Sequence, residues 1–169
     1  GWEMPSSWFQ SFNPMLIFVL TPFLNRFWGW QSQRASEPGS IVKMSIGCLI
    51  MGLGFLLLLA LVHGLPAGQK LHWLWLLACV FFFTVGEIYL SPIGLSFVSK
   101  IAPRKVIAMM MGVWLLSSFF GNYMAGFLGS YYERIGAERF FGLMIVLSLA
   151  ATAILMVLAR KLRQTVREM

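Results

Sequence analysis

Glu87 is the residue of this sequence whose position could do chemistry, because it lies inside a long apolar run. It follows Leu71 by sixteen residues and precedes Val98 by eleven, so it would sit near the middle of a membrane-crossing helix. An ionised carboxylate at that depth costs roughly 2.5–3.5 kcal/mol on insertion scales, and residues kept there usually serve a function. Glu87 is suited to binding a cationic substrate group or a proton. A protonated carboxyl that hydrogen-bonds a neighbouring helix is the structural alternative.

The residues around Glu87 add a polar stripe and an expected helix irregularity to the same run. Thr84 at i−3 and Ser91 at i+4 share the helical face of Glu87. Pro92 lacks a backbone N–H, which leaves the carbonyl of Ile88 without its i+4 partner and predicts a kink or an unwound turn. Broken helices at mid-membrane depth are typical of transporter binding sites, although a simple packing kink would give the same pattern.

Two other apolar runs carry polar or aromatic residues at comparable depth. Asn13 precedes Pro14 in the first run, where it could contribute to a site or cap the helical segment that Pro14 begins. Trp114 lies eight residues from the nearer end of the fourth run, and Ser118 follows it at i+4. The depths of Trp114 and Glu87 then differ by only about 5 Å, so both could face one cavity. Packing or lipid contact is the alternative for Trp114.

Two further patterns in the apolar runs indicate packing and membrane position. Small residues at four-residue intervals let another helix approach closely, and such a stripe comprises Ser117, Gly121, Ala125 and Gly129. Indole rings suit the headgroup layer, and four tryptophans lie near expected helix ends, namely Trp28, Trp30, Trp73 and Trp75. We expect no further function of either group.

The elements that must position these residues are membrane-crossing helices. Apolar residues make up 59% of the 169 residues and charged residues only 11%, against about 25% charged residues in a soluble globular protein. A crossing helix needs about 20 mostly apolar residues. Five runs qualify, at 8–28, 41–62, 71–98, 106–130 and 140–159. The composition therefore predicts an all-α integral membrane protein with five transmembrane helices.

The loop charges predict how these helices are oriented, because Lys and Arg near helix ends are retained on the cytoplasmic side. Ten of the 13 basic residues fall on one side, namely Arg26, Arg34, Lys43, Lys100, Arg104, Lys105, Arg160, Lys161, Arg163 and Arg167. This split predicts a cytoplasmic C-terminus and an N-terminus outside. Five helices that begin outside are expected if earlier helices precede them, so we expect the chain to be a fragment.

Several other function classes have little support in the sequence. The net charge of +7 is scattered between apolar runs, which does not favour a nucleic-acid partner. Cys48 and Cys79 lie inside such runs, where a thiol behaves as a small hydrophobe. His63 and His72 lack the cysteines or carboxylates that a metal site needs. We find no Ser-His-Asp or Cys-His constellation and no phosphate-binding loop, and we therefore expect neither an enzyme nor an ATP-driven protein.

Three motifs give the chain a resemblance to a known family. They are FQSFNP at 9–14 with TPF at 21–23, GEIYLSPIGLS at 86–96, and MMGVWLLSSFFGNYMAG at 110–126. Nearly the whole chain resembles the proton-dependent oligopeptide transporters of the major facilitator superfamily. The resemblance implies that residues 1–169 are a C-terminal helical bundle, corresponding to helices eight to twelve of a twelve-helix core. The N-terminal half of such a transporter is absent.

The resemblance also implies a function and a set of site residues. In the family, the glutamate matched by Glu87 binds the free amino group of a peptide, the asparagine matched by Asn13 helps to hold that group, and the tryptophan matched by Trp114 borders a side-chain pocket. Ser91 and Ser118 are added to the substrate site from their positions. Ile88 and Tyr89 depart mildly from the family's usual residues after the glutamate.

The implied activity is proton-coupled symport of di- and tripeptides across the cytoplasmic or inner membrane by alternating access. Protons are the coupling ion, and no other cofactor is implied. The implied partners are small peptides, the lipid bilayer and the missing N-terminal half, which carries the family's main proton-coupling residues. A major facilitator symporter for another small substrate, such as nitrate, and a non-transporting membrane scaffold subunit are the competing readings.

Overall fold

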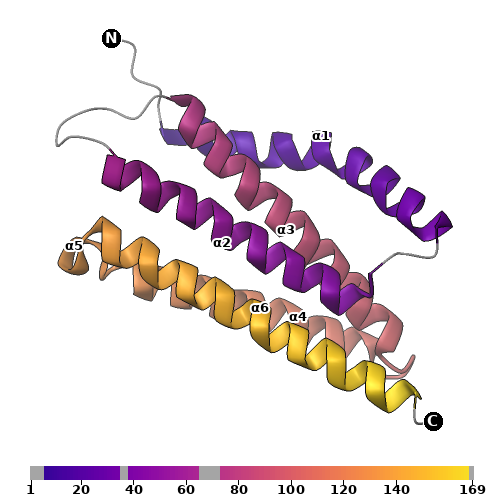
Figure 1. The fold of residues 1–169 in the computed structure, drawn as a ribbon. Helices are drawn as coiled ribbons and strands as arrows, with labels where there is room; N and C mark the ends of the chain where they lie inside the picture. Colours follow the sequence, from indigo (N-terminus) through magenta and orange to yellow (C-terminus); the bar gives the residue numbers. More distant parts are fainter. Residues whose placement is uncertain (1–5, 35–37, 65–72, 168–169) are drawn as a thin grey trace.

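The computed structural model describes residues 6–34, 38–64 and 73–167, and these residues form helices without strands (Figure 1). The helices are α1 (Ser6–Gln33), α2 (Ser40–Gly64), α3 (Trp73–Ile101), α4 (Ile107–Gly129), the short α5 (Tyr132–Ile135) and α6 (Ala137–Arg167). Gly136, with φ at 79°, makes the turn between α5 and α6 in a conformation that favours glycine. The predicted all-α fold is confirmed.

Four helices of the described chain are long and apolar enough to cross a membrane. They are Ser40–Gly64, Trp73–Ile101, Ile107–Ile135 and Ala137–Leu162. The first predicted span, 8–28, does form a helix, but α1 is not among these four. Its apolar part is bounded by Asn13 on one side and by Asn25 and Arg26 on the other. That α1 crosses the membrane stays a prediction.

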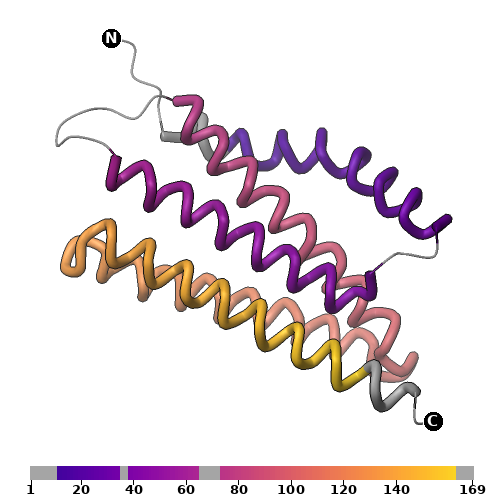
Figure 2. Tube along the Cα trace, viewed as in Figure 1, coloured from indigo at the N-terminus to yellow at the C-terminus, as the bar shows by residue number. Residues whose placement is uncertain are grey.

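Helix α3 is the helix against which three other helices pack. On one side α2 packs along it, and α2 in turn packs along α6. Helices α1 and α4 each contact α3 as well, and α1 arches along the outer side of the bundle (Figure 2). A residue on α3 can therefore meet side chains from three other helices.

Two glycines set the rotation of α3 against α2. A Cβ added to Gly86 would lie 2.9 Å from the carbonyl oxygen of Gly47, and one added to Gly47 would lie 2.9 Å from the carbonyl oxygen of Gly86. The two backbones approach this closely only because neither residue has a side chain. Gly86 faces α2, so Glu87, turned about 100° further around the helix, is directed toward α1.

The helix break expected beside Glu87 does not occur. Helix α3 runs without interruption from Trp73 to Ile101 with Pro92 inside it, and α1 likewise contains Pro14 and Pro22. A single proline removes one backbone hydrogen bond, and the bonds on either side of it keep the helix continuous. The unwound turn is therefore a wrong prediction, and a kink at Pro92 stays a prediction.

The small-residue stripe of α4 meets no helix in the described part of the chain. No residue of α4 is buried, and nothing lies within 4 Å of a Cβ added at Gly121 or Gly129. Contact with another helix along this stripe stays a prediction.

Candidate functional site

A hydrogen-bonded group of three side chains joins α1 to α3. Asn13 Nδ2 donates to Glu87 Oε2 at 3.0 Å, and Thr84 Oγ1 donates to Asn13 Oδ1 at 2.6 Å. Thr84 is fully buried, whereas Asn13 and Glu87 are each partly exposed. The predicted common face of Thr84 and Glu87 is thus occupied by one partner, Asn13. The group provides a carboxylate in a partly buried setting with its orientation held by an amide.

The carboxylate of Glu87 keeps room for another donor. An ionised carboxylate has about four acceptor positions, and Asn13 occupies one of them. Partial burial strengthens the attraction of the remaining positions for a cation, because water screens the charge less there. The arrangement can therefore bind an ammonium group or a proton.

Asn13 reaches this group from within its helix and does not cap it. Helix α1 begins at Ser6, seven residues earlier, and the Asn13 side chain bonds to α3. The capping alternative is therefore wrong. Asn13 and Glu87 are 74 residues apart, so no spacing in the sequence joins them.

Trp114 packs on the same face of α3, further along the helix. A Cβ added at Gly94 would overlap the six-membered ring of Trp114, so the missing side chain of Gly94 makes room for the indole. Gly94 follows Glu87 by seven residues, which is two turns on the same face and about 10 Å along the axis.

Ser91 and Ser118 lie beside this face without joining the three-residue group. Ser91 is exposed and stands one turn beyond Glu87, between it and Gly94. Ser118 is exposed on α4, one turn beyond Trp114. No hydrogen bond found among the described residues links either serine to Asn13 or Glu87.

A second cluster between α1, α2 and α3 was not predicted. Trp28 Nε1 donates to the hydroxyl of Tyr89 at 3.2 Å, and the two rings meet edge to face at 5.1 Å between centroids. The ammonium of Lys43 lies 4.7 Å from the centre of the Trp28 ring, and Lys43 is only 7% exposed. Trp28 therefore ties three helices together, a role that the sequence did not predict, while its position in the headgroup layer stays a prediction.

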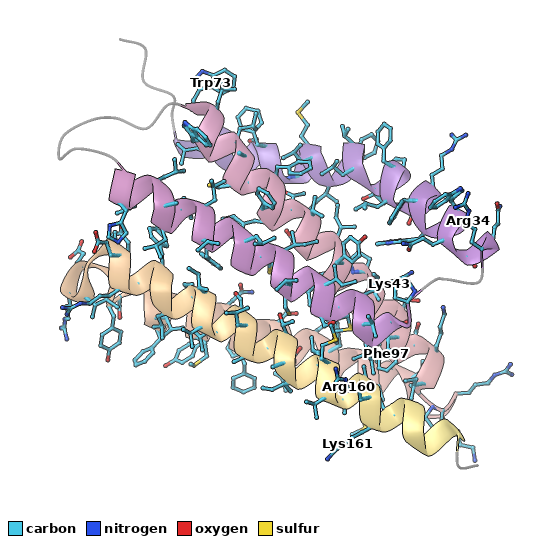
Figure 3. The ribbon with its side chains drawn as sticks, in the orientation of Figure 1. Arg34, Lys43, Trp73, Phe97, Arg160 and Lys161 are labelled. Carbon is cyan, nitrogen blue, oxygen red and sulfur yellow. The ribbon has the colours of Figure 1, made fainter. Side chains whose placement is uncertain are left out.

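The other three tryptophans near helix ends are exposed. The guanidinium of Arg34 stacks over Trp30 at 3.9 Å at the end of α1. Trp73 and Trp75 are exposed at the start of α3. Figure 3 places Trp73 and Arg34 at opposite ends of the bundle.

The described residues contain no group of three or more His, Cys, Asp or Glu that could hold a metal ion. His63 lies 3.4 Å from the carboxylate of Glu138, both exposed, so this pair joins the end of α2 to the start of α6. His72 lies outside the described residues.

Comparison with known proteins finds that this chain is similar to transporters. The family model described as the POT family matches residues 1–143. A peptide transporter of Yersinia enterocolitica is 36% identical over 133 residues, which cover 78% of this chain and 26% of that protein. A di-/tripeptide transporter of Lactococcus lactis is 27% identical over 156 residues, covering 91% of this chain and 31% of that protein.

A solved structure shows the same arrangement of helices. The crystal structure of a peptide transporter POT in complex with sulfate superposes with a TM-score of 0.83 at 30% identity. The match covers 95% of this chain and 32% of that one. The chain thus spans between a quarter and a third of the length of the relatives it matches.

Proposed function

We propose that this chain, which belongs to the POT family, provides the C-terminal part of the peptide site in a proton-coupled symporter of di- and tripeptides. The family is one of transporters, not enzymes, and the apolar helices make the chain part of a multi-pass membrane protein. Residues 1–169 act in this proposal as a C-terminal bundle that works with an N-terminal half. The observation that carries it is the Glu87 carboxylate held by Asn13 between α1 and α3.

In this proposal Glu87 binds the free amino group of the peptide. The ammonium occupies acceptor positions that Asn13 leaves open, and Asn13 keeps the carboxylate oriented toward it. The charge state of Glu87 belongs to the coupling cycle, with protons as the coupling ion and no further cofactor. Proton and peptide can drive alternating access only if they bind one state of the transporter more tightly than the other.

Trp114 lies at a suitable distance to contact a peptide side chain. A peptide extends at most about 3.3–3.6 Å per residue, so a tripeptide reaches about 10 Å. That length matches the two turns of α3 between Glu87 and Gly94, where the Trp114 ring packs. Ser91, between them, and Ser118, beside Trp114, are proposed to contact the peptide along this path.

The basic residues support a cytoplasmic C-terminus in the cell's cytoplasmic (inner) membrane. Figure 3 shows Arg34, Lys43, Arg160 and Lys161 toward one end of the bundle and Trp73 at the other. Retention of Lys and Arg on the cytoplasmic side then orients the chain.

The test uses the complete protein that carries this sequence, reconstituted in liposomes with an inward proton gradient. Dipeptide uptake is measured in wild type, Glu87→Gln and a control, Glu133→Gln, which alters an exposed glutamate of α5. We expect wild type and the control to take up dipeptide, with competition by free-amino but not N-acetylated dipeptides. Glu87→Gln should lose this uptake.

Two results would count against the proposal. Wild-type uptake rates in Glu87→Gln would remove the role of Glu87. No dipeptide uptake by folded wild type under any gradient would favour another small substrate, or the scaffold role if substrates in general fail.

A further inference from the structure

The hydroxyl of Thr84 lies between two acceptors. Its oxygen is 2.6 Å from Asn13 Oδ1 and 2.7 Å from the carbonyl oxygen of Val80, one turn back in α3. A hydroxyl has one proton to donate, so it serves one of these acceptors at a time. Thr84 is fully buried, so the acceptor to which its hydroxyl donates determines which atom of the Asn13 amide it can pair with.

When the hydroxyl donates to Asn13 Oδ1, the amide nitrogen of Asn13 points at Glu87. An amide N–H requires an acceptor, and an ionised carboxylate is an acceptor only. This arrangement, the one in the structure, therefore suits ionised Glu87.

When the hydroxyl donates to Val80, a second complete arrangement becomes available. The Thr84 oxygen can then accept from the amide nitrogen of Asn13 after a half-turn of the carboxamide, whose two ends have nearly the same shape. Asn13 Oδ1 then faces Glu87 and needs a donor, which a protonated carboxyl provides. The added proton resides on Glu87, and the Thr84 proton only rotates between its two acceptors.

We propose that Thr84 is a positioning residue that turns the Asn13 carboxamide to match the charge on Glu87. Each protonation state then pairs the donors and acceptors that these three side chains present to one another. The inference deepens the proposed function and rests on it, because it assigns Glu87 a change of charge during transport. Thr84 lies outside the motif at 86–96 that carries the family resemblance.

Other titratable or charged groups occur on the helices packed around Glu87, and the test must separate their effects from that of Thr84. They are Arg26 of α1, Lys43, Cys48 and His63 of α2, Cys79, Tyr89 and Lys100 of α3, and Tyr123 of α4. Tyr89, two residues from Glu87, receives a hydrogen bond from Trp28. Asn13 is the side chain that the structure bonds to Glu87. Two substitutions at Thr84 that leave all these groups in place isolate its hydroxyl.

The variants are Thr84→Val, which keeps the shape and removes the hydroxyl, and Thr84→Ser, which keeps the hydroxyl. Proton-driven dipeptide uptake by the complete protein in liposomes is measured as KM, kcat and pH profile. Thermal unfolding in detergent confirms that both variants fold.

We expect Thr84→Ser to match wild type within about twofold, and Thr84→Val to raise KM about threefold to tenfold, the effect of one hydrogen bond. The bond to the ionised carboxylate is the stronger, charge-assisted one and is polarised by Thr84. Its weakening in Thr84→Val should therefore change the pH profile of uptake, whereas Thr84→Ser should leave that profile as it is in wild type.

Three outcomes overturn the inference. A KM and pH profile of Thr84→Val equal to wild type would show that the hydroxyl does not orient the site. Equal defects in Thr84→Ser and Thr84→Val would point to packing and not to the hydroxyl. Absence of wild-type uptake would refute the proposed function and with it the role of Thr84. The first two outcomes, in which wild type does take up dipeptide, would refute the role of Thr84 alone.

Discussion

Gly86→Ala should destabilise the protein, because the new methyl group has no room between α3 and α2. Its Cβ would lie 2.6 Å from Met51 Cγ and 2.9 Å from the carbonyl oxygen of Gly47. The methionine side chain can move aside, but the carbonyl belongs to the helix backbone. Ordinary contact begins at 3.4 Å, so the two helices must separate by about 0.5 Å along this crossing.

The expected change in the free energy of unfolding combines two destabilising contributions and one stabilising contribution. Overpacking of a close contact costs about 1–3 kcal/mol, and loss of close Cα–H to carbonyl contacts adds about 0.5 kcal/mol. Alanine is a better helix former than glycine by up to about 1 kcal/mol. We therefore expect a net loss of about 1–2 kcal/mol in the free energy of unfolding.

The assay is unfolding of the complete protein by sodium dodecyl sulfate in mixed micelles, followed by circular dichroism. Gly142→Ala is the matched control, because Gly142 lies inside α6 and nothing lies within 4 Å of its added Cβ. The control should equal wild type or exceed it by up to about 1 kcal/mol. Uptake by Gly86→Ala should also fall, since Gly86 sets the direction of Glu87.

A free energy of unfolding of Gly86→Ala within about 0.3 kcal/mol of the wild-type value would contradict this prediction, because a change at the surface has so small an effect. The prediction also fails if Gly142→Ala is destabilised equally. The second result would mean that any added methyl group perturbs the bundle, and that the close contact between Gly47 and Gly86 is no more sensitive than other positions.

Two further predictions concern the contacts on either side of the candidate site. Trp28→Phe should lower the free energy of unfolding by about 1–2 kcal/mol, because it loses the hydrogen bond to Tyr89 and weakens the contact with Lys43. In a Tyr89→Phe background the same substitution should lower that free energy by less. Purely additive losses would disprove the coupling of the two residues. Trp114→Ala should change the ranking of dipeptides that differ in side-chain size, measured by competition for uptake, more than it changes the maximal rate. Gly94→Ala, which displaces the same ring, should alter that ranking too, and an unchanged ranking in both variants would exclude Trp114 from the pocket.

The helices could be predicted from the sequence because lipid allows little else. Long apolar runs must satisfy their backbone groups internally, so all five runs form helices where the structure describes them. Their ends were less accurate: α6 continues to Arg167, eight residues beyond the predicted end at Ala159. Polar residues continue a helix into water as readily as apolar ones do, so hydropathy does not show the residue at which the helix ends.

Residue spacing predicted the site within one helix, whereas the family resemblance alone joined Asn13 to Glu87 across two helices. The i−3 spacing placed Thr84 on the face of Glu87, and the structure confirms that both contact Asn13. The contacts of Trp28 were not predicted because they join different helices. Its partners Tyr89 and Lys43 come from two other helices, and periodicity within α1 carries no information about them.

The two ties between α1 and α3 determine what a change at Glu87 can move. Asn13 and Trp28 are separated by about 22 Å of α1, whereas their partners Thr84 and Tyr89 are separated by about 7.5 Å of α3. Helix α1 cannot follow α3 closely over that length, which agrees with its arched path (Figure 1). A substrate or proton that changes the bond between Asn13 and Glu87 acts on one tie, while the tie at Trp28 holds. Trp28→Phe should weaken the second tie without touching the carboxylate.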